Sequence, residues 1–164
     1  MKNLLIFGSG DHSKVILSEA LKLKRKYNIL GFCCDKNKIG KTIFKKGKKK
    51  YYVVCNFRNF KEKLRIKNFY GIIGIADNFV RKKIFVNLKK FKIKWESIIS
   101  IDSKINTNVK IGKGSFVASN SFINTGTIIK EHCIINTSSS LDHDNLFKNF
   151  SSTAPGVITG GNVK

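Results

Sequence analysis

The sequence predicts two units of different fold class: an α/β unit with a small Rossmann-like parallel sheet over residues 1–93, and a parallel β-helix of hexapeptide repeats over residues 94–164. In the first unit, short apolar runs alternate with amphipathic stretches, and a glycine-rich turn joins the first two. In the second unit every sixth residue is apolar, a period that fits neither an α-helix nor a half-buried strand. Each half therefore needs its own architecture.

The first unit is predicted to begin with a strand at Leu4–Phe7, the turn Gly8–Lys14 (G-S-G-D-H-S-K) and a helix from Val15 to about Leu23. A second strand covers Ile29–Cys34 and ends at Asp35. This order is typical of a nucleotide-binding unit, in which backbone amides and the helix N-terminus hold phosphate oxygens and the acid bonds a ribose. The full G-x-G-x-x-G pattern is absent, so a tight turn without a ligand stays the alternative.

Two residues of this turn have a purely structural interpretation as well. Asp11 can be the N-cap of the following helix, since a carboxylate there accepts from free backbone N–H groups. His12 can be a surface residue of the first helical turn. Neither residue alone decides whether a ligand binds.

The rest of the first unit continues the alternation of strands and helices. The basic, glycine-containing connection Asn37–Lys50 is expected to be a loop over the sheet edge. The elements predicted after it are a strand at Tyr51–Cys55, a short basic helix at Phe60–Ile66, a buried strand at Tyr70–Ala76, a helix at Asp77–Phe91 and a connection at Lys92–Ser97. The residues expected on the inner side of the last helix are Phe79, Ile84, Phe85 and Leu88. Trp95 is expected to pack at the junction with the second unit.

The hexad period is the strongest signal in the second unit. The apolar positions are Ile99, Ile105, Ile111, Val117, Ile123, Ile129, Ile135, Leu141 and Phe147. The residues two places earlier are mostly small, as a tight corner requires, and the turn glycines are Gly112, Gly114 and Gly126. Three short strands per coil give about three coils. The period is expected to break after Phe147, because Thr153 and Thr159 occupy the next two positions.

The composition limits the class of protein and of partner. The 164 residues carry a net charge of +22, which favours anionic small molecules and leaves nucleic-acid binding as an alternative. Lysine is spread over the whole chain among Asn, Ile and Phe, a mixture typical of biased codon usage, so specific nucleic-acid binding is not our prediction. No apolar run approaches the roughly 18 residues of a membrane span. We expect a cytoplasmic protein.

The four cysteines, Cys33, Cys34, Cys55 and Cys133, show no C-x-x-C spacing and no paired histidines. They are interpreted as reduced structural thiols, and no metal site is predicted.

Three separated segments together resemble one family. They are G-S-G-D-H-S-K-V-I near the N-terminus, G-I-A-D-N-F-V-R-K-K-I from Gly74, and I-I-N-T-S-S-S-L-D-H-D from Ile134 to Asp144. The chain resembles, from about residue 3 to its last residue, the sugar O-acyltransferases with a left-handed β-helix. This family includes sialic acid O-acetyltransferases and the N-acetyltransferases of UDP-linked 4-amino sugars.

The resemblance implies a homotrimer that binds acetyl-CoA in a groove between neighbouring left-handed β-helices and a nucleotide sugar on the N-terminal unit. It implies that His143 is the catalytic base and Asp144 its acidic partner. It places nucleotide-sugar contacts at Gly8, Ser9, Gly10, His12, Asp35 and Asn78, and acetyl-CoA contacts at Ser152 and Gly156. Arg81 is left outside the site as a helix-surface cation, and His132 is interpreted as structural or solvent-facing.

The proposed chemistry suits the residue types. An amine or hydroxyl must lose a proton as it attacks a thioester carbonyl, and histidine has a pKa near neutrality. A neighbouring carboxylate stabilises the imidazolium and orients the ring. Without the family, a histidine between two aspartates on an outer β-helix position would more often be an ordinary surface residue.

The sequence departs from the family at three places. Asp11 stands where members usually carry a second glycine, Ser152 stands where many have a histidine beside acetyl-CoA, and the chain ends at G-G-N-V-K where members continue for several hexads. The function predicted first is an acetyl-CoA-dependent acetyltransferase acting on a nucleotide-linked amino sugar or a sialic-acid-like sugar in surface glycan synthesis. The alternative is a truncated, non-catalytic homologue that binds only a nucleotide sugar.

Overall fold

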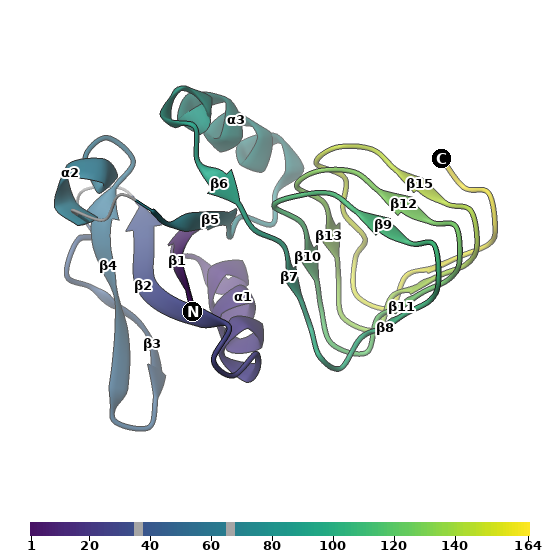
Figure 1. The fold of residues 1–164 in the computed structure, drawn as a ribbon, viewed down its shortest axis with the longest axis horizontal. Coiled ribbons are helices and arrows are strands. Elements are labelled where there is room, and N and C mark those ends of the chain that lie inside the picture. Colours follow the sequence, from purple (N-terminus) through teal and green to yellow (C-terminus); the bar gives the residue numbers. More distant parts are fainter. Residues whose placement is uncertain (35–37, 65–67) are drawn as a thin grey trace.

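A computed structural model describes residues 1–34, 38–64 and 68–164, and it contains the two predicted units side by side (Figure 1). The first is a six-stranded sheet with helices on its faces, and the second is a triangular stack of short parallel strands. Both parts of the predicted fold class, including the left-handed β-helix of hexapeptide repeats, are confirmed. The division after residue 93 stays a prediction. Among the described residues, no helix has the length and apolar character that a membrane span needs.

The sheet of the first unit has the strand order β3-β4-β2-β1-β5-β6. Its strands are β1 (Lys2–Phe7), β2 (Tyr27–Cys34), β3 (Thr42–Lys46), β4 (Lys49–Asn56), β5 (Tyr70–Ile73) and β6 (Lys94–Trp95). All neighbours are parallel except β3 and β4, which form an antiparallel pair. The predicted loop at Asn37–Lys50 is therefore wrong: Thr42–Lys46 and Lys49–Lys50 form an ordered hairpin around Gly47, whose φ of 57° suits the turn.

The helices of this unit are α1 (Asp11–Lys22), α2 (Phe60–Leu64), α3 (Asn78–Leu88) and the 3-10 turn η2 (Lys89–Phe91). Helix α1 begins four residues before the predicted start, and its N-cap is Gly10, so the N-cap role suggested for Asp11 is wrong. Helix α3 is capped by Asp77, whose carboxylate accepts from the N–H of Val80 at 2.8 Å.

Helix α3 buries the predicted face except at its first turn, where Arg81 and not Phe79 is buried. Phe79 is 86% exposed, whereas Arg81 is 1% exposed. Leu88 is buried, and Ile84 and Phe85 pack against the core beneath the helix, as expected. The charge of Arg81 hid its position from a pattern of apolar residues, because its interior partners are polar groups.

The second unit repeats every 18 residues, so that each strand pairs with the strand one coil away, as in Phe116 with Ile98 and Ile134. Its strands form three sheets, β7-β10-β13, β8-β11-β14-β16 and β9-β12-β15. The bounds are β7 (Ile98–Ile99), β8 (Lys104–Ile105), β9 (Lys110–Ile111), β10 (Phe116–Val117), β11 (Phe122–Ile123), β12 (Ile128–Ile129), β13 (Ile134–Ile135), β14 (Ser140–Leu141), β15 (Leu146–Phe147) and β16 (Ile158–Thr159).

The predicted hexad residues form the core of this β-helix. Those buried in it include Val117, Ile123, Ile129, Ile135 and Leu141. Ile105, in the first coil, is 37% exposed. The predicted break after Phe147 is wrong, because Thr159 pairs in register with Leu141, one coil below. Threonine is tolerated there because its hydroxyl accepts from Asn145 Nδ2 at 2.8 Å.

From β8 onward, each turn of the β-helix contains one residue in the left-handed region, which directs the chain into the next face. These residues recur every sixth position: Asn108, Gly114, Asn120, Gly126, His132, Ser138, Asp144, Phe150, Gly156 and Asn162. Glycine and asparagine adopt this conformation easily, whereas Phe150 does so at a cost. Gly112 is needed for a different reason: a Cβ there would meet the carbonyl carbon of Lys130 at 2.5 Å.

The two units are packed through α1, which lies between the sheet and the β7-β10-β13 face. Ile16, Leu17 and Ala20 of α1 share one buried cluster with Phe116 and Ile134 of the β-helix. A second cluster on the opposite face of the sheet includes Phe60 and Leu88, so α2 and α3 cover that face. Trp95 packs at the junction as predicted, against Phe7, Phe85 and His132.

Candidate active site

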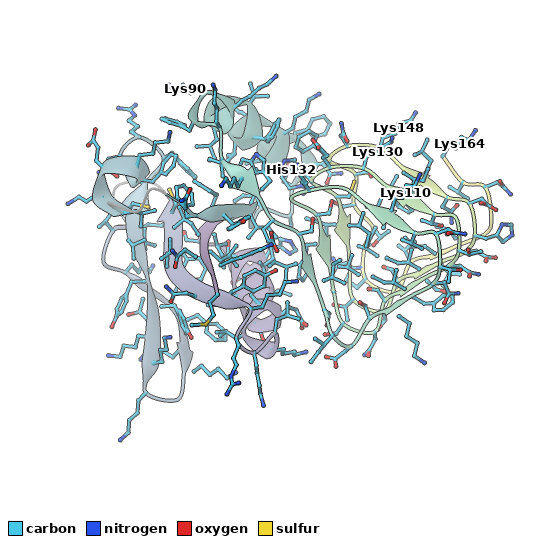
Figure 2. The ribbon with its side chains drawn as sticks, in the orientation of Figure 1. Lys90, Lys110, Lys130, His132, Lys148 and Lys164 are labelled. Atoms are coloured by element: carbon cyan, nitrogen blue, oxygen red, sulfur yellow. The ribbon has the colours of Figure 1, made fainter. Side chains whose placement is uncertain are left out.

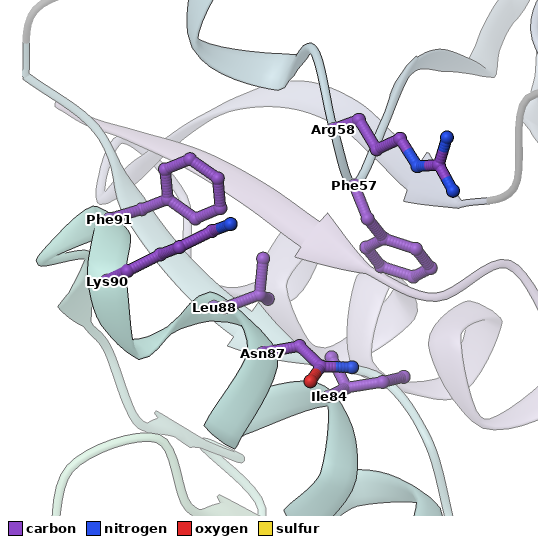
Figure 3. Close-up of a pocket in the computed structure, with 7 residues that line it drawn as sticks. All are labelled: Phe57, Arg58, Ile84, Asn87, Leu88, Lys90 and Phe91. Carbon is purple, nitrogen blue, oxygen red and sulfur yellow. The ribbon is translucent and has the colours of Figure 1, made fainter.

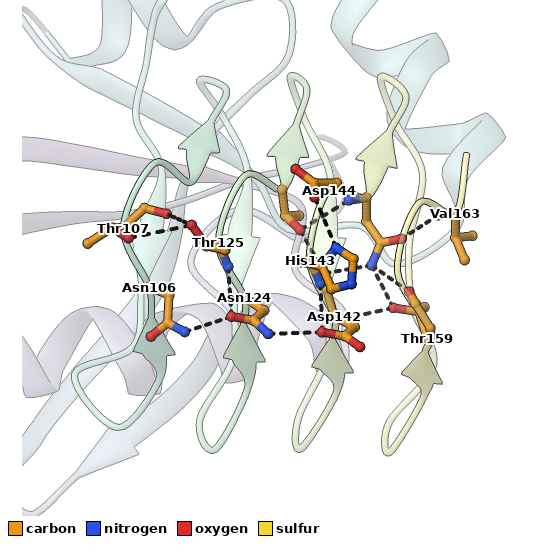
Figure 4. Close-up of polar contacts among 12 residues, drawn as sticks. Asn106, Thr107, Asn124, Thr125, Asp142, His143, Asp144, Thr159 and Val163 are labelled. Carbon is orange, nitrogen blue, oxygen red and sulfur yellow. Dashed lines mark hydrogen bonds and ion pairs between the residues drawn. The ribbon is translucent and has the colours of Figure 1, made fainter.

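The candidate catalytic corner lies where the β8-β11-β14-β16 face meets the β9-β12-β15 face. Three side chains stack there at intervals of 18 residues: Asn106 donates to Asn124 at 2.8 Å, and Asn124 donates to Asp142 at 2.9 Å (Figure 4). Asp142 also accepts from the backbone N–H of His143 at 2.8 Å. This ladder fixes the backbone immediately before His143.

His143 and Asp144 form the pair that the sequence predicted. His143 Nδ1 lies 2.9 Å from Asp144 Oδ2, and the two side chains are 46% and 57% exposed. Asp144 adopts the left-handed corner conformation, with a φ of 55°. Within the described part of the chain, Nε2 of His143 has no hydrogen-bond partner, so it remains available to a substrate.

Two glycines leave room for this pair. A Cβ on Gly161, one coil above His143, would lie 2.6 Å from both Cε1 and Nε2 of the imidazole. A Cβ on Gly126, one coil below Asp144, would contact the carboxylate directly. The hexad pattern revealed Gly126 as a turn residue but not its relation to Asp144, because that relation depends on the coil register.

The charges at this corner favour the protonated imidazole. The hydrogen bond with Asp144, followed by the charge of Asp142, raises the pKa of His143 above its usual 6.5. The hydrogen bonds from Asn124 and from the N–H of His143 lower the pKa of Asp142. A histidine of this kind accepts a proton readily and releases it at a higher pH.

The glycine turn lies at the carboxyl end of β1, as predicted for a nucleotide site. Gly8 has a φ of 123°, and a Cβ on it would lie 3.0 Å from the carbonyl oxygen of Gly74. Ser9 Oγ donates to Cys34 Sγ at 2.9 Å, while the space where a Cβ of Gly10 would lie is open. Asp35 lies outside the described residues. The ligand contacts assigned to this turn stay predictions.

His12 lies at the N-terminal end of α1 but packs toward the β-helix. Its ring meets Phe116 edge to face, with ring centroids 5.4 Å apart, and its Nε2 is buried without a partner in the described structure. Burial, helped by the charge of Arg81, lowers the pKa of His12 to about 4. The neutral ring is therefore part of the contact between units, and its role in phosphate binding stays a prediction.

Arg81, which the sequence predicts to be a helix-surface cation outside the site, connects the two units. Its Nε donates to the carbonyl of His132 at 2.8 Å, and its Nη1 donates to the carbonyls of Ile75 and Ala76 at 2.9 and 2.8 Å. Its Nη2 donates to the carbonyl of Phe150 at 2.8 Å. A buried guanidinium satisfied by carbonyls from several segments fixes those segments relative to one another.

Nη2 of Arg81 also bonds two residues that the sequence predicts to contact ligands, Asn78 and Ser152. It donates to Asn78 Oδ1 at 2.7 Å and to Ser152 Oγ at 2.8 Å, while Ser152 donates to Asn78 Oδ1 at 2.6 Å. Ser152 is thus engaged with the first unit. Gly156, the other predicted acetyl-CoA contact, lies in a turn of the coil with a φ of 69°, and its contact with a ligand stays a prediction.

His132 is a buried structural residue and not a solvent-facing one, the other role predicted for it. It is 1% exposed and stacks on Phe150 with an interplanar angle of 3°, while Phe85 and Trp95 lie 4.5 and 5.0 Å from it between ring centroids. Neither ring nitrogen has a partner in the described structure. Burial and the nearby Arg81 lower its pKa to about 4.

The structure does not bring all predicted site residues together in one chain. The glycine turn lies beside the β7-β10-β13 face, where His12 contacts Phe116. Asn78 lies beside the same face, where it accepts a hydrogen bond from Ser152. His143 lies at the corner between the other two faces, opposite that one. One chain therefore holds the two halves of the predicted site on different sides of its triangular β-helix.

The comparisons with known proteins begin with the first unit. A family model, the PglD N-terminal domain, matches residues 3–88. The chain belongs to the PglD N-terminal domain family. The matched segment contains the glycine turn and all of α3, so two of the three segments behind the predicted resemblance lie in this family domain. Comparison with curated protein sequences gives no match.

Solved structures resemble this PglD-family chain over both units. The acetyltransferase domain of PglB from Neisseria gonorrhoeae FA1090 has a TM-score of 0.85 at 25% identity, covering 99% of this chain and 75% of that one. The same domain in complex with acetyl coenzyme A has a TM-score of 0.83 at 24% identity, with 98% and 74% covered.

A third similar structure is a histidine-to-alanine mutant of GDP-perosamine N-acetyl transferase from Caulobacter crescentus, in complex with CoA and GDP-perosamine. Its TM-score is 0.86 at 19% identity, with 98% of this chain and 72% of that chain covered. The family and these likenesses agree with the predicted resemblance to sugar acyltransferases.

A separate hollow in this PglD-family chain lies away from the predicted contacts. It has a volume of about 310 Å³ and lies between the loop after β4 and the end of α3 (Figure 3). Phe57, Ile84, Leu88 and Phe91 line it, and Arg58, Asn87 and Lys90 complete its wall. None of the predicted site residues lines this hollow.

Proposed function

We propose that the protein transfers an acetyl group from acetyl-CoA to the amino group of a nucleotide-linked sugar, with His143 as general base. The exposed His143–Asp144 pair, 2.9 Å apart on a β-helix corner, is the observation that carries this proposal. It is supported by the structural likeness to the acetyl-CoA complex of PglB and to a GDP-perosamine N-acetyl transferase.

The chemistry follows from the geometry of the pair. Acetyl-CoA supplies a thioester whose carbonyl carbon is attacked by the sugar nitrogen. Asp144 engages Nδ1 of His143, so Nε2 is the atom that accepts the proton of the attacking amine. The carboxylate stabilises the imidazolium that results, and the proton then passes to the departing thiolate.

The site is completed by a second copy of the chain in a homotrimer. His143 lies opposite the β-helix face that packs on its own N-terminal unit, so it serves a nucleotide sugar held by a neighbouring chain. The groove between adjacent β-helices then receives acetyl-CoA beside Gly156. Ser152, which is bonded to Asn78 and Arg81, shapes that groove from beneath.

The nucleotide end of the substrate is held at the glycine turn. Ser9 and Gly10 place backbone amides at the start of α1, where phosphate oxygens are favoured, and Gly8, whose own N–H donates to the carbonyl of Cys33, leaves room for the ligand beside them. Asp35 and Asn78 contact the nucleoside and the sugar. The net charge of +22 attracts such an anionic substrate. The activity belongs to surface glycan synthesis in the cytoplasm, where both substrates are made.

The experiment that tests this proposal titrates the full chain with acetyl-CoA and measures its oligomeric mass on the same sample. Saturable binding to a trimer and amino-sugar acetylation that His143→Ala abolishes are the expected results. Turnover that survives this substitution in an intact trimer contradicts the role of His143. Nucleotide-sugar binding without any acetyl-CoA binding selects the alternative of a binding protein without activity.

A further inference from the structure

The β3–β4 hairpin carries an unusual concentration of charge. Between Asp35 and Glu62 the sequence has ten Lys and Arg residues and no acidic residue. Five of these, Lys45, Lys46, Lys48, Lys49 and Lys50, surround the turn at Gly47, and all five are exposed. The sequence alone predicts a loop here, and the proposed acetyl transfer does not use this segment.

The pairing within the hairpin places these charges directly against one another. Lys45 lies opposite Lys50 and Lys46 lies opposite Lys49 in the antiparallel register. Like charges at directly opposed positions destabilise a strand pair. In the described part of the chain, no carboxylate forms an ion pair with any of the five. The hairpin thus has an electrostatic cost that a bound anionic partner would relieve.

Protection of the sheet edge does not account for all five lysines. Strand β3 is the edge strand, and one or two lysines on it suffice to discourage pairing with another chain. Lys48 lies in the turn, however, whereas Lys49 and Lys50 of β4 pair with the edge strand, and pairing of β4 with β2 begins only at Val53. Lys48 therefore protects no strand edge.

The shape and chemistry of the hairpin indicate the kind of partner. Its tip points away from the body of the sheet and from the β-helix, so it presents a convex surface (Figure 1). Binding of a single nucleic-acid strand favours a groove with aromatic platforms, which a projecting tip of five lysines does not provide. The tip offers lysine instead, a compact point charge that suits a broad anionic surface.

We propose that the tip of the β3–β4 hairpin docks on an anionic phospholipid surface. The lysines contact lipid phosphates, and Tyr52 and Ile39, 41% and 43% exposed near the base of the hairpin, contribute amphipathic and apolar surface beside them. Each lysine near such a surface raises partitioning by about fivefold. The inference does not depend on acetyl transfer, because the hairpin contains no residue of the proposed site.

The test is sedimentation of the full chain with vesicles of phosphatidylcholine alone and with vesicles in which about one lipid in four is phosphatidylglycerol. We expect binding only to the anionic vesicles, lost when the salt concentration rises about tenfold. Binding to neutral vesicles that equals binding to anionic ones overturns the proposal, as does the absence of binding to both.

A matched pair of variants separates the hairpin from the general positive charge of the chain. In the first variant the five hairpin lysines are replaced: Lys45→Gln, Lys46→Gln, Lys48→Gln, Lys49→Gln and Lys50→Gln. In the second, five exposed β-helix lysines are replaced, three of them visible in Figure 2: Lys104→Gln, Lys110→Gln, Lys113→Gln, Lys130→Gln and Lys148→Gln. Both variants have the same net charge.

We expect the hairpin variant to lose at least about tenfold in vesicle partitioning, and the β-helix variant to lose less than about threefold. Circular dichroism confirms that both are folded. Equal losses in the two variants overturn the proposal, because they show that only the total charge matters. If the full chain binds a short DNA duplex more tightly than the anionic vesicles, the lipid proposal is overturned in favour of nucleic acid.

Discussion

Ser152 donates a hydrogen bond of 2.6 Å to Oδ1 of Asn78, which joins the last described bridge of the β7-β10-β13 face to the first residue of α3. Both groups also accept from Nη2 of Arg81. The loop that is proposed to hold the nucleotide sugar and the coil that is proposed to border acetyl-CoA therefore share one polar network. A change in this network is expected to affect both ends of the site together.

Arg81→Gln is expected to lower the free energy of unfolding by about 3 kcal/mol or more, because it leaves several buried carbonyl oxygens without a donor. Urea unfolding followed by circular dichroism measures this loss. Lys82→Gln, one residue further along α3 and exposed, is the matched control and should leave stability within about 0.5 kcal/mol of the original. Equal stability of the Arg81 variant and the control would show that the network does not hold the two units.

Gly161→Ala is expected to displace the imidazole of His143, because the new Cβ would lie 2.6 Å from the ring. The ring is exposed and can turn away, so thermal stability should change little while the acetylation rate falls by about tenfold or more. Gly160→Ala is the control, since no atom lies within 4 Å of a Cβ there. A Gly161 variant with full activity would exclude the proposed orientation of His143.

Asp144→Asn is expected to lower the pKa of His143, because the hydrogen bond and the charge of the carboxylate raise it. NMR titration of the ring protons measures this change directly. In the original protein the acetylation rate should rise with pH through a pKa above 6.5, where Nε2 loses its proton. In the variant that rise should move to lower pH with a lower plateau. An unchanged titration midpoint would contradict the pairing seen at this corner.

The buried histidines are expected to make the fold sensitive to acid. His132 has a pKa of about 4 in the folded chain and about 6.5 when unfolded, so the unfolded chain binds more protons between these values. Stability should therefore be complete above pH 6.5 and fall as the pH drops toward 4, by up to about 3 kcal/mol for this residue. His12 contributes in the same direction.

His132→Phe keeps the stacked ring and removes its titration. The variant should lose less stability than the original protein between pH 6.5 and 4, as measured by urea unfolding at several pH values. Identical pH dependence in both proteins would mean that His132 does not control it.

The regular parts of this fold could be predicted from the sequence because they repeat. The hexads predict the apolar core of the β-helix, and the apolar run Leu4–Phe7 with its glycine turn predicts β1 and a following helix, although α1 begins four residues earlier than predicted. Thr153 and Thr159 were misinterpreted because the period was judged from apolar character alone. Thr153 fills its inward place by accepting from the N–H of Asn136 at 2.8 Å.

The polar interior could not be predicted in the same way. Arg81 follows two apolar residues on α3, and only the three-dimensional packing shows that its partners are the carbonyls of a coil more than fifty residues away. The hairpin at Lys45–Lys50 was missed because its sequence has neither apolar alternation nor a strong turn pair. The charge of these residues has no role in the core of the sheet, and the partner we propose for it is an anionic surface.

The 18-residue repeat means that the position of His143 along the β-helix axis can change only by whole coils. Because each coil pairs only with the coils above and below it, removal of 18 residues from the middle of the β-helix would leave every corner in phase. His143 would then shift along the axis by about 4.8 Å and still face the same direction. Removal of a single residue would instead rotate it off its corner. During evolution, the axial distance between His143 and the N-terminal unit can therefore change only in steps of one coil.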